Sequence, residues 1–376
     1  MIEEWLWGGG AILDFRFWIA PTYPLRKVCS RWLMVSKEKT LAPTTQKLGS
    51  RQFRIQNSKF GIAPAPVLLL LSMIWPSAPA VGAGPQAVTT EPKQVLLPAG
   101  LTRKPFDVTR HVVPLSEIRE GGPARDGIPA LVYPTFLAAH KPAGILKDTD
   151  RVLGVSLNGV AKAYPLRILN WHELVNDELG GRPILVGWCP LCGSGLVYDP
   201  VIEGRRYDFG VSGKLYKRNL LFFDRQTDSL WSQLLCEAVT GPMAGTRLHI
   251  LPAENTTWGA WKQSHRATLV LSFATGYQRN YEQDPYAGFR FPRRPALLVS
   301  NGEHIRIYPF SELSETRGKL AGQLGADSFR ISFDRRAKAA RVESQVTITY
   351  FVGFLDDLEA FFPMAEVIHS RRQRKK

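Results

Sequence analysis

The clearest pattern of apolar and polar positions lies between residues 152 and 181. Two stretches, VLGVSL at 152–157 and VAKAY at 160–164, flank Asn158-Gly159, a dipeptide typical of a two-residue β-hairpin turn. Pro165 then suits the first position of a helix, and apolar residues recur at helical spacing until Gly180-Gly181. The pattern predicts a hairpin followed by a helix that the two glycines end.

The next two apolar stretches flank a pair of cysteines. Residues 184–188 and 196–198 are rich in β-branched and aromatic side chains, which is typical of buried strands. Between them, Gly193 and Gly195 give the backbone the freedom that a tight reversal needs. We therefore expect Cys189 and Cys192 to lie at the tip of a second hairpin.

The same order of elements recurs near the C terminus. Residues 297–313, LLVSNGEHIRIYPFSEL, echo residues 152–169, VLGVSLNGVAKAYPLRIL, with Arg306 opposite Lys162 and Tyr308-Pro309 opposite Tyr164-Pro165. A strand is predicted after each copy, but the second copy has no cysteines. If the unit is duplicated, the fold does not require the cysteine turn, and the turn is there for chemistry.

Further strands separate the two copies, which makes the chain β-rich. They are predicted at residues 205–211, 220–224, 229–233, 246–251 and 268–272, with a turn at 226–228. A helix is predicted over 256–265, with Trp258 and Trp261 on one face, and an amphipathic helix over 351–362. The fold class is α+β: one β-rich domain over residues 106–363, with an internal duplication of a strand-turn-strand-helix-strand unit.

The first ninety or so residues do not resemble part of a folded core, and they contain the pattern of an export signal. Residues 63–75, APAPVLLLLSMIW, have the length of the apolar region of a signal peptide, basic residues precede them, and Ala78-Pro79-Ala80 fits a cleavage site. We predict a signal peptide over 61–80 and an exported protein, periplasmic or extracellular, or membrane-tethered if the signal is not cleaved. Residues 1–60 are then an upstream extension or a mis-called start, and 81–105 a flexible lead-in.

The formal net charge of +15 comes mostly from the two ends of the chain. Residues 1–60 carry about +6 and the end of a predicted basic tail over 364–376 adds +5, so the body between them is nearly balanced. No phosphate loop, dinucleotide fingerprint or nucleic-acid motif occurs. We predict no nucleic-acid partner, and no stable membrane span after signal cleavage.

Three kinds of chemistry remain open for Cys189 and Cys192. They are a structural disulfide, half of a metal knuckle and a redox dithiol. A metal needs further ligands, and His172 is the best candidate because its helix leads into the cysteine strand. Two thiolates and an imidazole suit a zinc or copper ion. Removal of the signal would leave Cys236 as a third, odd thiol.

Four ordered motifs resemble the DUF3179 family, a set of mostly exported bacterial and archaeal proteins of unknown function. They are NWHELVND at 170–177, CPLCGS at 189–194, FGVSGKLYKRNLLFFDRQTDSLWSQ at 209–233 and TWGAWKQSHRATLVLS at 257–272. The resemblance implies export and lends no activity, so whether the protein is an enzyme stays open. Trp188 stands where the family usually has Tyr, Arg266 where it often has Pro, and a cysteine at position 236 is unusual.

The motif positions extend the candidate site beyond the cysteines and His172. Glu173, Cys236, Ser212 and Gln233 are the candidate supporting residues. An alternative function is a binding module for a cell-envelope polymer or a small polar ligand, with a structural disulfide. That module would use residues 212–219 and exposed tryptophans.

Overall fold

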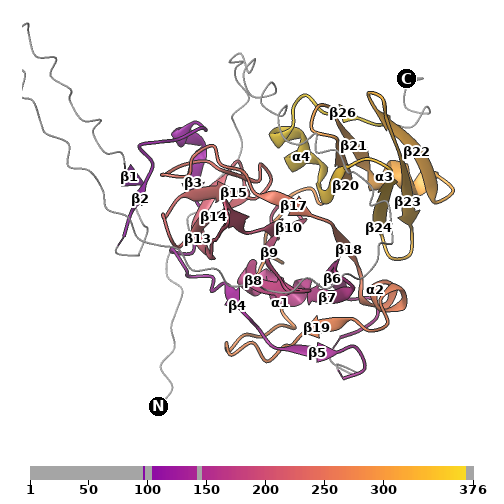
Figure 1. Cartoon of the computed structure of the whole chain (residues 1–376), viewed down its shortest axis with the longest axis horizontal. Helices are drawn as coiled ribbons and strands as arrows, with labels where there is room; N and C mark the ends of the chain where they lie inside the picture. Colours follow the sequence, from indigo (N-terminus) through magenta and orange to yellow (C-terminus); the bar gives the residue numbers. More distant parts are fainter. Residues whose placement is uncertain (1–95, 98–103, 142–145, 370–376) are drawn as a thin grey trace, which may run out of the picture. The chain divides into compact units, whose positions relative to one another are not determined.

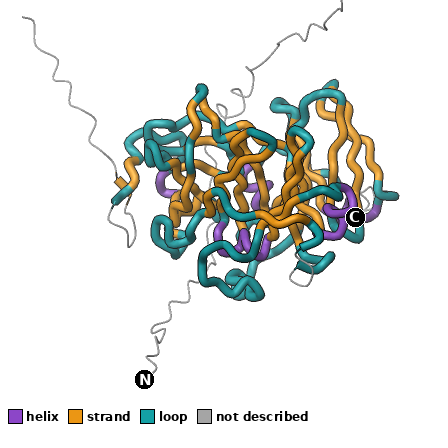
Figure 2. Tube along the Cα trace, turned by 60° about the horizontal axis from the view of Figure 1, so that its bottom comes forward, coloured by secondary structure: helices purple, strands orange, loops and turns teal. Residues whose placement is uncertain are grey.

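The computed structural model describes residues 96–97, 104–141 and 146–369, all of which belong to one compact unit. Strands dominate these residues, and their four α-helices have only six or seven residues each (Figure 2). The sheets pack face to face in a β-propeller-like arrangement (Figure 1). The predicted upstream extension, the signal peptide, almost all of the lead-in and residues 370–376 of the basic tail lie outside the described residues.

A first sheet is built on the predicted Asn-Gly hairpin, which is confirmed. Asn158 and Gly159 both have positive φ, 52° and 77°, as a two-residue hairpin turn requires. The strand order is β18 (Ala253–Thr257), β6 (Arg151–Leu157), β7 (Val160–Pro165), β19 (Leu269–Leu271) and β5 (Phe136–Ala138). Strand β19 pairs with β7 in parallel, and the other pairs are antiparallel.

A second sheet repeats the order and the directions of the first four of these strands. It consists of β25 (Thr349–Phe354), β20 (Pro295–Ser300), β21 (Ile305–Pro309) and β26 (Glu366–Val367), with β26 parallel to β21. The helices α1 (Leu166–His172) and α3 (Phe310–Glu315) follow β7 and β21, and α2 (Trp258–Ser264) and α4 (Leu355–Phe361) follow β18 and β25. The two halves therefore share one topology, and their origin by duplication stays a prediction.

Each half also contains a three-stranded antiparallel meander. The first is β8 (Leu174–Leu179), β9 (Arg182–Cys189) and β10 (Ser194–Asp199), and the second is β22 (Lys319–Leu324), β23 (Asp327–Asp334) and β24 (Ala339–Ser344). Strand β10 packs against β25 of the second half, and β24 packs against β18 of the first. Each meander therefore contacts the hairpin sheet of the other half.

A further sheet packs against the first meander. It runs β16 (Glu237–Ala238), β15 (Leu230–Ser232), β14 (Asn219–Asp224), β13 (Phe209–Tyr216) and β3 (Ile118–Glu120). Tyr198 of β10 shares one core with Phe209 and Phe222 of this sheet. The remaining strands are β1 (Leu96–Leu97) paired with β2 (Phe106–Asp107), β11 (Val201–Ile202) with β12 (Arg205–Arg206), β17 (His249–Leu251) with β10, and β4 (Leu131–Val132) with β8.

The predicted helix up to Gly180-Gly181 is wrong. Helix α1 ends at His172 because Glu173 adopts a positive φ of 55°, and residues 174–179 form strand β8. Likewise, the predicted closing helix over 351–362 begins only at Leu355, because residues 349–354 pair with β20. None of the described helices has the length and apolar character needed to cross a membrane.

Candidate functional site

The two cysteines lie at the turn between β9 and β10, as predicted. Cys189 and Ser194 are the last paired residues, and the four residues between them make the turn. Both thiols are free and buried, with 1% and 0% of the residues exposed. They lie within hydrogen-bonding reach of each other, and burial is the main cause that raises the pKa of the Cys192 thiol well above its usual range.

A buried polar network holds this turn against β14 and β15. The Gln233 amide donates to the carbonyls of Gly187 (3.2 Å) and Ser194 (2.9 Å), and its oxygen accepts from Asn219 (2.8 Å) and from the Ser194 hydroxyl (2.8 Å). The second Asn219 contact is Nδ2 to the Cys192 sulfur, at 3.6 Å. Gln233 therefore holds the cysteine turn in place, and its supporting role in any chemistry stays a prediction.

An ion pair next to the cysteine turn links the turn between β13 and β14 to helix α4. Arg218 donates two hydrogen bonds to Asp357, at 2.9 and 2.7 Å, and only 3% of the Asp357 side chain is exposed. The Arg218 carbonyl accepts from the Cys192 thiol at 3.5 Å, and the Cys192 carbonyl accepts from the backbone N–H of Phe354 at 2.7 Å. Burial raises the pKa of Asp357, and the Arg218 guanidinium opposes that effect.

An irregular loop, residues 273–294, docks on the NWHE motif at the end of α1. Trp171 Nε1 donates to the Gln283 carbonyl at 3.1 Å, and the Asn170 amide donates to Asp284 at 3.2 Å. We call residues 273–294 the aromatic loop, since they include three phenylalanines and three tyrosines. Through Phe291 it also reaches the Arg218 guanidinium, which lies 4.9 Å from the ring centroid. The motif is therefore the docking point of this loop.

Glu173 is the most perturbed carboxylate of the site. Burial raises its pKa to about 7, and the hydroxyl of Tyr286, which donates to Glu173 Oε1 at 2.6 Å, opposes that rise. Tyr286 lies close enough to Cys189 for a negative charge on that sulfur to raise the tyrosine pKa further. The Glu173–Tyr286 pair thus joins the aromatic loop to the surroundings of Cys189. Beside Tyr286 is a cavity of about 260 Å³, which Asn170, Trp171 and Phe289 also line.

His172 is not placed as a third ligand for the cysteines. Its Nδ1 donates to the Pro129 carbonyl (2.8 Å), and its Nε2 accepts from the Tyr281 hydroxyl (2.7 Å). Burial lowers its pKa, so the ring is a neutral, fully hydrogen-bonded histidine beneath the aromatic loop. Over the described ranges, no three His, Cys, Asp or Glu side chains gather to hold a metal ion. The expected zinc or copper set of two sulfurs and His172 is therefore not assembled there.

Two other predicted supporting residues, Ser212 and Cys236, make hydrogen bonds to the backbone. The Ser212 hydroxyl donates to the Leu221 carbonyl and accepts from the Lys214 N–H, inside a bulge of β13. The Cys236 thiol donates to the Gln233 and Leu234 carbonyls, and burial raises its pKa to about 12. The hydrogen bonds of these two side chains go to nearby backbone groups and not to Cys189 or Cys192.

The tryptophans give no support to the alternative polymer-binding module. Trp231, Trp258 and Trp261 are at most 2% exposed, and the predicted helix that carries the last two is confirmed as α2. Trp231 donates to the buried Asp224 carboxylate, and Trp261 donates to Thr268. No tryptophan of this group is available to stack on a ligand.

The sequence did not single out three residues of the site, Arg218, Tyr286 and Asp357. Arg218 lies inside the long motif over 209–233, so its place in that motif was a usable signal. The only signal for Asp357 was an acidic residue within a predicted amphipathic helix, where a buried carboxylate needs a partner. The aromatic loop had one signal, several aromatic residues within an irregular polar stretch.

Comparison with known proteins gives a family and no activity. Neither a curated protein nor a solved structure matches the chain. The profile of the family described as "Protein of unknown function (DUF3179)" matches residues 125–362, more than half of the chain. This range includes the cysteine turn, the NWHE motif, the aromatic loop and α4. The chain therefore belongs to the DUF3179 family.

Proposed function

We propose that Cys189 and Cys192 form a redox-active dithiol that exchanges electrons with the disulfide of a partner protein. The observation that carries the proposal is a matched pair of turns. The turn from Cys189 to Ser194 and the turn from Asp334 to Ala339 join corresponding strands with the same number of residues. Ala337 stands where the first turn has Cys192, so the second thiol serves chemistry and not the turn.

The proposed exchange has two steps, with Cys189 as the attacking residue and Cys192 as the resolving residue. The Cys189 thiolate attacks one sulfur of the partner disulfide, which releases one partner thiol and leaves a mixed disulfide. Cys192 then attacks the Cys189 sulfur and releases the second partner thiol. Two electrons and two protons pass to the partner, and Cys189 and Cys192 become one disulfide. Cys192 acts second because burial raises its pKa.

Glu173 is the residue best suited to accept the proton of Cys189. A group with a pKa near the working pH exchanges protons most effectively, and the pKa of Glu173 is about 7. The Tyr286 hydroxyl, bonded to Glu173, connects the carboxylate to the neighbourhood of Cys189. In this proposal the aromatic loop moves aside to admit the partner.

A Tyr286→Phe variant tests the role of the loop. Loss of the hydrogen bond to Glu173 removes about 1.4 kcal/mol of docking free energy, so Cys189 reacts about tenfold faster with iodoacetamide. Peptide mapping by mass spectrometry gives the rate for each cysteine. Tyr277→Phe is the matched control, because Tyr277 is an exposed tyrosine of the same loop. Equal rates for both variants and the wild type contradict the gating role.

Incubation of the reduced full-length protein with oxidised glutathione tests the dithiol itself. The proposal expects a Cys189–Cys192 disulfide that dithiothreitol reverses without unfolding, with Cys236 unmodified. A Cys236→Ser variant should behave like the wild type. Two thiols that stay unoxidised, or a disulfide that only denaturant makes reducible, contradict the proposal. Stoichiometric zinc or copper on the purified protein would favour the metal-binding hypothesis instead.

A further inference from the structure

In the first half of the domain, a segment of the chain itself fills the space between two strand edges. Residues Leu131–Ala138 contribute β4, which adds to β8 in parallel, and β5, which adds antiparallel to β19 (Figure 1). The Tyr133 N–H donates to the Asn176 carbonyl at 2.9 Å and continues the pairing with β8. This segment covers both edges and so completes the first half.

The side chains of this segment seal the space beneath it. The Phe136 ring meets Tyr164 edge to face, with centroids 5.5 Å apart, and Lys162 Nζ lies 3.9 Å from the Phe136 centroid. Leu131 is buried in the same core as Tyr164, opposite Val175 of β8. A leucine and, five positions later, a phenylalanine are therefore the anchors of the segment.

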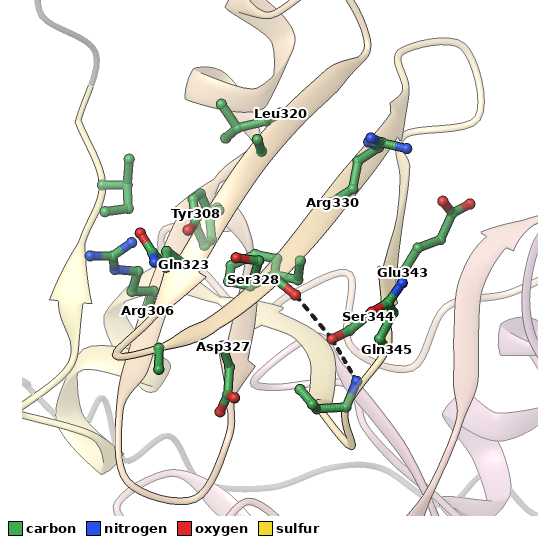
Figure 3. A pocket seen from close by; sticks show the side chains of 16 residues that line it. Arg306, Tyr308, Leu320, Gln323, Asp327, Ser328, Arg330, Glu343, Ser344 and Gln345 are labelled. Carbon is green, nitrogen blue, oxygen red and sulfur yellow. Dashed lines mark hydrogen bonds between the residues drawn. The ribbon is translucent and has the colours of Figure 1, made fainter.

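The second half has the same two edges, and a groove lies along β22 and next to the end of β26. Among the described residues, β22 and β26 are edge strands of their sheets, and they hold the positions that β8 and β19 hold in the first half. The groove has a volume of about 1140 Å³ (Figure 3). We call it the β22–β26 groove, and its lining includes Arg306 and Tyr308 of β21, Leu320 of β22 and Ile368.

The lining of the groove reproduces the anchor positions of the first half. Arg306 and Tyr308 correspond to Lys162 and Tyr164, which hold the Phe136 ring. Leu320 pairs with Ile331 as Val175 pairs with Val186, so Leu320 corresponds to Val175. In the first half, Val175 is the residue that Leu131 pairs with. The groove thus offers one site for an aliphatic side chain and one for an aromatic ring.

We propose that the β22–β26 groove binds an extended segment of a partner protein by strand addition. The segment runs parallel to β22 and carries a leucine and, five positions later, an aromatic residue, as Leu131–Ala138 does in the first half. The charged lining residues are two of each sign, Arg306 and Arg330 with Asp327 and Glu343. This balance favours an uncharged segment over a polyanion or the basic end of this chain. The proposal is independent of the cysteine chemistry.

A peptide copied from residues 130–138, ALVYPTFLA, is the probe for this site. Its fluorescein-labelled form should bind the full-length protein saturably at one site in an anisotropy titration. A peptide with alanine in place of the phenylalanine should bind about tenfold more weakly, because the ring loses its buried contacts. The absence of saturable binding of this peptide by the wild-type protein overturns the proposal.

Variants of β22 show whether the peptide binds in this groove or instead displaces residues 131–138 from the first half. Leu320→Asp places a charge in the groove and should weaken binding at least tenfold. Lys319→Asp, an exposed neighbour outside the lining, should leave it within twofold. If Leu320→Asp does not fold, Arg306→Ala serves instead and should weaken binding about threefold through the lost cation–π contact. Unchanged binding by a folded groove variant overturns the proposal.

Discussion

An Arg218→Ala variant is expected to unfold with a free energy about 3 kcal/mol below that of the wild type at pH 7, since it leaves a buried carboxylate unpaired. The estimate lies at the low end for a broken buried pair because the Arg218 side chain is one third exposed, at 34%. Urea unfolding followed by tryptophan fluorescence measures the change. The loss should shrink at acidic pH, where Asp357 takes up a proton.

The neighbouring pair on α4 is the matched control for this prediction. Arg294 bonds to Asp356, but its side chain is 59% exposed, so Arg294→Ala should cost less than about 1 kcal/mol. Replacing Asp357 as well as Arg218 removes the unpaired charge and should recover part of the stability. Equal effects of Arg218→Ala and Arg294→Ala would show that Asp357 is not held by Arg218 in the way described.

A Glu173→Gln variant is expected to change how the stability depends on pH. The pKa of Glu173 is about 7 in the folded protein, above its ordinary value of 4.5, so the folded state binds the proton more tightly than the unfolded state. The stabilising effect of the protonated form is fully present below about pH 4.5 and is lost as the pH rises to about 7. The wild type should therefore lose on the order of 3 kcal/mol relative to the variant between pH 4.5 and pH 8.

The free energy of unfolding at several pH values, measured for both proteins, isolates this effect. His172 acts in the opposite direction, since its lowered pKa makes the fold less stable at acidic pH, but that contribution is common to both proteins. Glu178→Gln is the control, because Glu178 is an exposed carboxylate on β8, the strand after Glu173. Parallel pH profiles for the wild type and Glu173→Gln would contradict the description of Glu173 as a buried acid.

The sequence predicted the hairpins well because their signals are local. Asn158-Gly159 has the turn chemistry that the backbone needs, and the apolar residues on both sides of Cys189 and Cys192 define two strands. The helix α2 was also predicted, since Trp258 and Trp261 lie on one buried face. These elements depend on neighbours in the sequence and not on distant contacts.

The break after α1 could not be predicted from local pattern. Residues 166–179 are compatible with helical spacing, and only the positive φ of Glu173 ends the helix early. Distant contacts stabilise that conformation. The Tyr286 hydroxyl donates to the Glu173 carboxylate, and the backbone N–H of Trp188 donates to the Glu173 carbonyl at 2.7 Å. The expected pairing of His172 with the cysteines failed for the same reason, because residues far along the chain, Tyr281 and Pro129, satisfy the ring.

The candidate site as a whole depends on long-range contacts of this kind. Arg218, Asp357 and Tyr286 come from a strand turn, a helix and an irregular loop that are separated by up to 139 residues in the sequence. No periodicity relates them. The cysteine pair was the part of the site that a local motif could indicate, and its surroundings needed the fold.

A redox titration of the full-length protein in glutathione buffers, with acid quenching and mass-spectrometric counting of thiols, tests the central proposal most directly. We expect Cys189 and Cys192 to titrate together as one two-electron couple, with a slope of about 30 mV per tenfold change in the ratio of reduced to oxidised forms. A Cys192→Ser variant should instead stop at a glutathione adduct on Cys189. Independent titration of the two thiols, or no oxidation across the whole range, would contradict a redox-active dithiol.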